Sequence, residues 1–244
     1  MDLSIISRTG GPVLFWRGPD YDRLDLTGPV VANWVNKGVG LFGDYGLGPD
    51  FTLFVPMPAG LHWRELVAIL SVLLADGRVV LGAGSQEDQA DGAAASADIP
   101  TALDGDFHAL VPLGHENDER LSAAEEVFVY NPPALALSTP VDEDFIDVNS
   151  AIRAYPDVTP RRLQATGTLL VGDEEIAWTE PADDSGSGIL VANSTPQPHE
   201  WATFLDHLLR GGESVLANGM DEARITDLAS SLGEVRGRLG AWTK

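Results

Sequence analysis

The stretch FTLFVPMPAGLHWRELVAILSVLLADGRVVLGAG, residues 51–84, decides the fold. Its residues are typical of a strand, a Pro/Gly turn, a helix and a second strand. The apolar residues from Leu66 to Leu74 recur at i, i+3, i+4, i+7 and i+8, which is one face of an α-helix. A strand, helix, strand order with short turns requires two parallel strands and a right-handed crossover. The stretch therefore predicts a βαβ unit.

A second stretch, SGILVANSTPQPHEWATFLDHLLRGGESVLANG at residues 187–219, repeats this order. Its apolar stripe runs from Trp201 to Leu209 with the same spacing, at a constant offset of 135 positions from the first stripe. Two such units predict an α/β protein with mainly parallel sheets and flanking helices. We expect a single domain, residues 1–244, with two pseudo-symmetric halves at 1–140 and 141–244.

The remaining sequence predicts several further elements. Thr27 is expected to cap a helix that is weakened by three glycines, Gly38, Gly40 and Gly43. We also expect strands at 13–16 and 107–113, a hairpin over 168–178 that turns at 172–175, and helices at 121–126, 142–155 and 221–232. Of two polar stretches, 85–98 predicts a loop or a short surface helix, and 181–188 predicts a linker.

The composition limits the classes of function. Of 244 residues 44% are hydrophobic, so the chain can bury a large core. Thirty-seven acidic and 15 basic residues give a formal charge of −22, which repels nucleic acid and anionic membranes. The absence of cysteine excludes disulfides and thiolate chemistry. The N-terminus does not resemble a signal peptide and the longest apolar run, 66–75, is too short for a membrane span, so we expect a cytoplasmic protein.

Histidines and carboxylates are the candidate metal ligands. His199 and His207 are eight positions apart on one expected helix, whereas two ligands from one helix are usually three or four apart. The acidic cluster at 142–147 lacks the glycine and the spacing of a calcium loop, and a solvated helix start is the favoured interpretation. We therefore expect no metal and no cofactor. The residues considered were His62, His108, His115, His199, His207, Asp142, Glu143, Asp144 and Asp147.

Motifs of nucleophilic or nucleotide chemistry are also absent from the sequence. There is no G-x-S-x-G, and no G-x-G-x-x-G joins a strand to a helix. Ser185–Gly188 could contact a phosphate, but its composition favours a linker. Trp63 and Trp201 occupy equivalent helix starts and could line a pocket, although aromatic packing between the halves is the plainer interpretation. We therefore assign no catalytic and no cofactor-binding residue.

Residues 23–82, which begin RLDLTGPVVANWV and end with GRVVLG, resemble the opening of adenylate-forming enzymes, the superfamily of acyl- and aryl-CoA synthetases and adenylation domains. The closer resemblance is to short, uncharacterised actinobacterial proteins that look like a truncated N-terminal domain of that superfamily. It extends over nearly the whole chain and includes VDEDFIDVNSAIRAYPDVTP at 141–160 and GGESVLANG at 211–219. The resemblance implies an acetyl-CoA synthetase-like α/β fold.

The resemblance also indicates what is missing. The enzymes hold a triphosphate with a loop of the form TSGTTGxPKG, in which backbone N–H groups, hydroxyls and a lysine contact the phosphates. In the corresponding interval, 164–188, only Thr166–Thr168 is a faint counterpart, and no lysine occurs between Lys37 and Lys244. Acidic residues at 173–175 (Asp173, Glu174 and Glu175) would repel a triphosphate. The family's later adenosine and magnesium motifs and its C-terminal domain with the catalytic lysine have no counterpart.

The sequence leaves several classes of function open. The leading hypothesis is a non-catalytic, truncated relative of adenylate-forming enzymes that acts by binding or by association, with another protein or with itself. The alternative is a small-molecule binder that holds an acyl or aryl carboxylate or a CoA-type ligand in the groove between the two units. The third hypothesis is a structural partner of another protein that associates through an exposed apolar face. An enzyme that uses the acidic clusters is the least favoured hypothesis.

Overall fold

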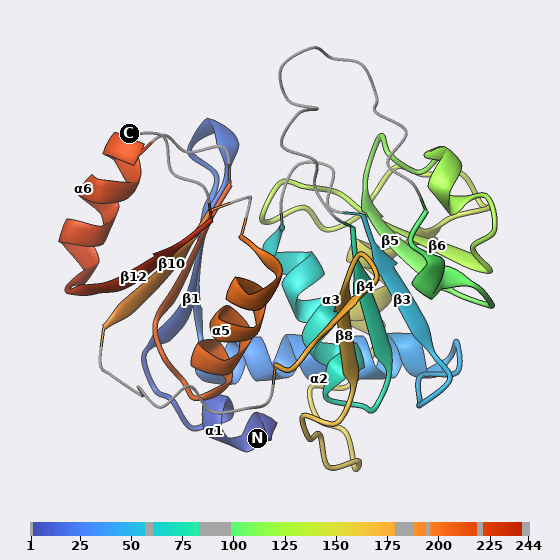
Figure 1. The fold of residues 1–244 in the computed structure, drawn as a ribbon, viewed down its shortest axis with the longest axis horizontal. Coiled ribbons are helices and arrows are strands. Elements are labelled where there is room, and N and C mark those ends of the chain that lie inside the picture. The colour runs from blue at the N-terminus through green and yellow to red at the C-terminus, as the bar shows by residue number, and fades with distance from the viewer. Residues whose placement is uncertain are drawn as a thin grey trace.

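Two β-sheets form the framework of the protein (Figure 1). The computed structural model describes residues 2–56, 61–82, 99–178, 188–193, 196–218 and 222–240. In spatial order, the seven-stranded sheet consists of β7 (Ile146–Asp147), β6 (Glu126–Tyr130), β5 (His108–Pro112), β3 (Thr52–Val55), β4 (Arg78–Leu81), β8 (Thr168–Val171) and β9 (Glu174–Ile176). The five-stranded sheet consists of β12 (Val235–Leu239), β10 (Ile189–Ala192), β11 (Ser214–Ala217), β1 (Pro12–Arg17) and β2 (Arg23–Thr27).

The predicted α/β class with mainly parallel sheets is confirmed. Among the strands of the described residues, β1 with β2 and β8 with β9 pair antiparallel, and the other neighbouring strands are parallel. The two sheets are not consecutive stretches of the chain. β1 and β2, from the start of the chain, complete the five-stranded sheet, while β8 and β9 lie at the edge of the seven-stranded one.

Both βαβ units are present, one in each sheet. The first is β3, α3 (Trp63–Leu73) and β4, and the second is β10, α5 (Pro198–Leu209) and β11. The offset of 135 holds for the helix and the second strand, but not for the first strand. In the first unit Phe54 pairs with Val80, and in the second unit Val191 pairs with Val215. Phe54 and Val191 are therefore equivalent, and they are 137 positions apart. The connection from strand to helix is therefore two residues shorter in the second unit.

Helices α3 and α5 lie between the two sheets (Figure 1). All 11 residues of α3 are buried, because the helix is enclosed on every side. The buried hydrophobic side chains of both helices belong to one continuous core, which also includes residues of both sheets. The other helices are α1 (Leu3–Ser7), α2 (Gly28–Gly43), α4 (Val148–Ala151) and α6 (Glu222–Leu232), with 3₁₀ turns η1 (Pro19–Tyr21), η2 (Thr101–Leu103), η3 (Glu119–Leu121) and η4 (Ile152–Ala154).

The glycines of α2 allow close packing. A Cβ atom at Gly38 would lie 2.3 Å from Ser71 Oγ of α3, and one at Gly40 would lie 2.7 Å from the Tyr155 ring. α2 therefore continues through residues that weaken an isolated helix, because its packing requires them. Thr27 is the N-cap residue, as predicted, although its side chain makes no capping hydrogen bond.

Some predicted elements are confirmed and two are wrong. The hairpin of β8 and β9 and the helix α6 are present, whereas 121–126 is no helix, because η3 ends at Leu121 and Glu126 already belongs to β6. The helix expected from residue 142 starts only at Val148, with Asp147 as its cap, since Ile146 pairs with Phe128 as an edge strand. Asp142, Glu143 and Asp144 therefore precede the helix and do not start it.

Two expected polar segments cannot be compared with the structure. The stretch 85–98 and residues 181–187 of the expected linker lie outside the described residues. Within the described part, no helix is both long and apolar enough to cross a membrane.

Candidate functional site

The topology of the seven-stranded sheet points to one location for a site. β4 lies on one side of β3 and β5 lies on the other. The connections that leave β3 and reach β5 therefore run to opposite sides of the sheet, and the strand order reverses between these two strands. In open parallel sheets, ligands bind outside the carboxyl ends of strands at such a switch point. The first turn of α3, which follows β3, lies there and carries three polar residues that are at most 7% exposed, His62, Arg64 and Glu65.

His62 caps α3 and is fully hydrogen-bonded. Its Nδ1 accepts a bond of 3.1 Å from the Arg64 backbone N–H, and its Nε2 lies 2.9 Å from the Pro132 carbonyl oxygen. These two partners require a neutral ring with its proton on Nε2. Burial, followed by the charge of Arg64, lowers the pKa of His62 to about 3. The ring also stacks on Tyr130, with centroids 4.9 Å apart.

Glu65 completes a capping box with His62. Its Oε2 accepts a 2.8 Å hydrogen bond from the His62 backbone N–H, and the side chain is fully buried. Burial raises the pKa of Glu65 to about 8, despite the opposing effects of this N–H and of the nearby Tyr130 hydroxyl. Burial and the charge of Glu65 in turn raise the pKa of Tyr130 well above its usual value. The carboxyl is therefore a neutral acid at pH 7.

Arg64 attaches a distant segment to this turn. Its Nη2 donates to the carbonyl oxygens of Ala134, at 3.1 Å, and Ala136, at 2.9 Å, and its guanidinium lies 4.4 Å from the centre of the Trp63 ring. Burial lowers the pKa of Arg64 to about 10, so the side chain keeps its charge at neutral pH. A buried cation is thus held by carbonyl dipoles and an aromatic face.

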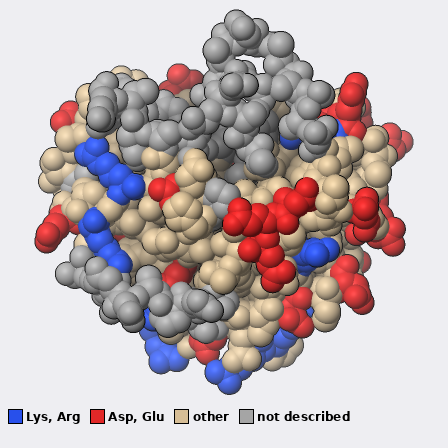
Figure 2. Space-filling model, in the orientation of Figure 1, with Lys and Arg blue, Asp and Glu red and all other residues tan. Residues whose placement is uncertain are grey.

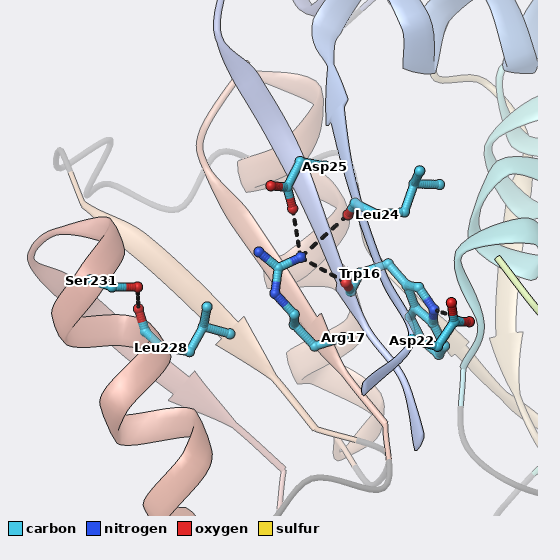
Figure 3. A network of polar contacts seen from close by, with 7 residues as sticks. All are labelled: Trp16, Arg17, Asp22, Leu24, Asp25, Leu228 and Ser231. Carbon is cyan, nitrogen blue, oxygen red and sulfur yellow. Dashed lines mark hydrogen bonds and ion pairs between the residues drawn. The ribbon is translucent and has the colours of Figure 1, made fainter. Parts of the chain in front are cut away.

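Residues 131–138, which we call the pinned loop, are also held from other directions. Asp22 Oδ2 accepts bonds from the Ala134 backbone N–H at 2.9 Å and from Trp16 Nε1 at 3.4 Å. Asn149 Oδ1 accepts from the backbone N–H of Asn131 at 3.1 Å. Figure 3 shows Trp16 and Asp22 facing each other beside β1, next to the Arg17 contacts. The loop is therefore tied to both sheets.

The pinned loop presents apolar side chains to solvent. Leu135 is 76% exposed and Leu137 is 63% exposed, while Ala134 between the anchoring bonds is buried. Fixing the backbone of a loop costs conformational entropy, which is usually offset in part by burial of the loop's apolar side chains. Here the loop is fixed while its leucines stay exposed, which is typical of an interaction surface. We call the polar residues that hold the loop and the helix turn beside it the anchoring cluster: His62, Arg64, Glu65, Asp22 and Asn149. This cluster preorganises an exposed apolar surface.

Catalysis by the anchoring cluster is not supported by its geometry. Both ring nitrogens of His62 are engaged, and Glu65 has no exposed surface. Four buried side-chain atoms nevertheless have no hydrogen bond of good geometry within the described residues: Trp63 Nε1, Arg64 Nε, Glu65 Oε1 and His108 Nδ1. The first three follow one another in the first turn of α3, so a polar ligand atom at this turn would gain partners.

The other histidines are separate from this cluster and from one another. His108 stacks on Phe51, with centroids 4.7 Å apart, and lies 3.6 Å from Glu125; burial lowers its pKa. His207 contacts the Glu213 carbonyl at 3.2 Å, and His199 and His115 are exposed. Within the described ranges, no group of three histidine, aspartate or glutamate side chains could hold a metal ion.

The described start of the interval 164–188, up to Trp178, makes close backbone contacts with α3 and the residues after it. The N–H of Gly167 donates to the Leu73 carbonyl at 2.8 Å, and the N–H of Thr168 donates to the Gly77 carbonyl at 3.0 Å. A two-residue turn, Gly172 and Asp173, joins β8 to β9. Thr166–Thr168 thus forms a close packing site against α3. Ser185–Ser187 lies outside the described residues.

Trp63 and Trp201 are both buried, at 2% exposure each. Trp63 meets Trp34 edge to face at 5.6 Å, and Trp201 meets Phe204 at 6.2 Å. Between the two units the buried hydrophobic side chains form the continuous core, and two hollows lined by described residues lie elsewhere. The role of His62 and Glu65 was missed in the sequence, although their three-residue spacing before an apolar helix is that of a capping box.

Comparison with known proteins gives a likeness in fold. No protein-family model and no curated protein matches the sequence. Among solved structures, an acyl-CoA synthetase from Brucella canis has a TM-score of 0.60 and 13% sequence identity, with 96% of this chain and 46% of that chain covered. The chain therefore spans less than half the length of that synthetase. At this identity the likeness concerns the fold, and the protein has a mixed α/β fold that is also found in an acyl-CoA synthetase.

Proposed function

We propose that the protein acts by association, on a fold shared with adenylate-forming enzymes, and that it does not form adenylates. The observation that carries this proposal is the pinned loop. Its backbone is fixed by bonds from His62, Arg64 and Asp22, yet Leu135 and Leu137 face solvent. A preordered apolar surface loses little conformational entropy on binding, so it suits recognition of a partner.

The absence of adenylation is supported by the β8–β9 hairpin. In the resemblance to adenylate-forming enzymes, the phosphate loop belongs in this interval, but here the turn has two residues and exposed carboxylates at Asp173, Glu174 and Glu175. Figure 2 shows acidic side chains gathered near the middle of this face. No lysine lies between Lys37 and Lys244 to neutralise a triphosphate.

Pyrophosphate exchange tests this part of the proposal. The full chain, incubated with ATP, magnesium, labelled pyrophosphate and a series of carboxylic acids, should give no exchange above a protein-free control. Titration with ATP should also leave the melting temperature unchanged, since a bound ligand would raise it. Exchange that depends on a carboxylic acid would overturn the proposal.

The pinned loop is tested by a double variant, Leu135→Ser with Leu137→Ser. Because both side chains are exposed, the variant should fold like the wild type and lose the proteins that co-purify with it. Ile99→Ser, at a residue that is 48% exposed elsewhere, is the matched control and should keep them. Equal recovery of partners with all three proteins would contradict a role for this loop.

A second candidate is a small-molecule binding protein, with the site at the first turn of α3. The unpaired Trp63 Nε1, Arg64 Nε and Glu65 Oε1 favour it, since a ligand with a carbonyl or carboxylate oxygen would supply acceptors to the first two atoms. A hydrophobic carboxylate or a CoA-type ligand fits this chemistry. Thermal shift with each class tests it: a rise in melting temperature that Arg64→Gln abolishes supports the site, and no rise contradicts it.

A further inference from the structure

A row of polar side chains crosses the seven-stranded sheet at the amino ends of three neighbouring strands. Thr52 of β3 pairs with Arg78 of β4, and Arg78 pairs with Thr168 of β8. Because side chains alternate between the two faces of a strand, these three lie on one face together with the residues two positions further along. Those next residues are buried in an apolar cluster: Phe54, Val80 and Leu170. The row is therefore the polar end of an otherwise apolar face.

The row lines a hollow with a volume of about 480 Å³, within the range of small-molecule sites. Thr52 is 9% exposed, Arg78 and Thr168 are half-buried, and the turn 104–106 also lines the hollow. The strands from β3 to β6 and β8 are parallel, and the pinned loop follows the carboxyl end of β6. The hollow therefore lies at the opposite edge of the sheet from the pinned loop.

The polar groups of the row have no partners among the described residues. There, the hydroxyls of Thr52 and Thr168 make no hydrogen bond, and the Arg78 guanidinium makes neither a hydrogen bond nor an ion pair. A hydroxyl that is buried together with its side chain normally has a partner, so Thr52 gains one if a ligand occupies the hollow. A guanidinium with hydroxyls on both sides is a set of donors that suits a carboxylate.

Four exposed aspartates line the same hollow, and within the described part of the chain none of them has an ion pair: Asp50, Asp76, Asp104 and Asp106. With Arg78 as the one cation of the lining, four aspartates give a formal charge of −3. Such a charge attracts cations. No group of three acidic or histidine side chains in the described ranges could hold a metal ion, so an organic cation suits the hollow better.

We propose that this hollow binds a basic amino acid, a molecule with one carboxylate and two cationic groups. Its carboxylate accepts from Arg78, Thr52 and Thr168, and its cationic groups face the aspartates. Both kinds of charge in the hollow are then paired. A diamine would instead bring a cation to Arg78, and an acidic amino acid would bring a second anion to the aspartates, and both contacts are repulsive.

Calorimetric titration of the full chain tests the ligand class with lysine, arginine and two analogues of lysine. Norleucine lacks the distal cation of lysine, and 1,5-diaminopentane lacks its carboxylate. At about 0.15 M salt, where distant charges are screened, lysine or arginine should bind at least about tenfold more tightly than either analogue. General attraction to an acidic protein would favour the diamine, which carries the larger positive charge. Binding of the diamine as tight as that of lysine overturns the proposal, as does the absence of binding by both amino acids.

Three variants locate the site. Arg78→Gln and Thr52→Val remove donors to the carboxylate, and Asp104→Asn with Asp106→Asn removes acceptors for the cations. Each should weaken binding of lysine by about tenfold or more, because each removes a hydrogen bond to a charged group. Arg78→Gln should also reduce the preference for lysine over the diamine, whereas the aspartate variant should reduce the preference for lysine over norleucine. Lysine binding that none of the three weakens overturns the site.

The matched controls make the same changes of charge at exposed residues elsewhere. Arg153→Gln corresponds to Arg78→Gln, and Glu174→Gln with Glu175→Gln corresponds to the aspartate variant. Both controls should bind lysine as the wild type does, and circular dichroism and ligand-free melting temperatures establish that all variants are folded. Equal losses in the controls and the site variants would assign binding to the overall charge and overturn the site. Neither result bears on pyrophosphate exchange or on partners that co-purify through the pinned loop.

Discussion

At the scale of single residues, Glu65 is an ionisable group whose side chain has no contact with solvent. Its carboxyl is enclosed by α3, Tyr130 and His62, and burial raises its pKa to about 8. In the unfolded chain the same group titrates near 4.5. The native state therefore binds a proton that the unfolded state releases between these values, and the free energy of unfolding falls as pH rises from 4.5 to 8.

His62 has the opposite effect at lower pH. Burial lowers its pKa from 6.5 to about 3, so the unfolded state binds a proton that the native state refuses, and the free energy of unfolding falls as pH drops from 6.5 to 3. Between pH 4.5 and 6.5 the two slopes oppose each other. Together, these residues favour maximal stability in that interval.

Replacement of Glu65 by glutamine isolates its contribution. Glu65→Gln keeps an oxygen for the His62 N–H and has no charge to desolvate. Between pH 6.5 and 8 the wild type should lose stability by up to about 1.4 kcal/mol per pH unit, and the variant should stay level. Urea unfolding at pH 6.5, 7.25 and 8 measures both. Parallel losses in the two proteins would assign the pH dependence to other groups.

At the scale of elements, the contact between α2 and α3 depends on a missing side chain. Gly38→Ala would place a Cβ atom 2.3 Å from Ser71 Oγ, whose bond to the Val35 carbonyl joins the two helices. Overpacking of this kind destabilises by about 1–3 kcal/mol. Gly43→Ala, in the same helix, meets no atom within 4 Å and should be neutral or stabilise by about 0.5–1 kcal/mol. Thermal unfolding compares the pair, and similar melting temperatures would contradict tight packing.

Elements with local signals were predictable from the sequence, and those created by distant contacts were not. The βαβ units follow from periodicity within about 35 residues, and the β8–β9 hairpin follows from its turn. The short strand β7 exists because Ile146 pairs with Phe128 of β6, and the segment around Ile146 has no strand pattern of its own. Likewise, the pinned loop is ordered by His62 and Arg64, 70 residues earlier in the chain.

At the scale of the whole molecule, Asp22 is one of the polar links between the two sheets. It follows η1, beside the five-stranded sheet, and accepts bonds from Trp16 and from Ala134 in the pinned loop. Asp22→Ala leaves the Ala134 N–H without an acceptor and should destabilise by about 1–3 kcal/mol. Asp22→Asn keeps an acceptor oxygen and is the matched control. Hydrogen exchange at Ala134 should quicken in the first variant only; equal protection in both would show that Asp22 does not hold the loop.

The pairing of β1 with β11 has a consequence for how the chain folds. Leu14 pairs with Ser214, so 200 positions separate two adjacent strands. The β1–β2 hairpin is synthesised before the other strands, and its inner edge stays unpaired until all seven strands of the other sheet have been made. Closing so long a segment is slow, and an open strand edge invites pairing with other chains. Aggregation during synthesis is therefore the main hazard of this topology, and chaperones that shield β1 would raise the yield of folded protein.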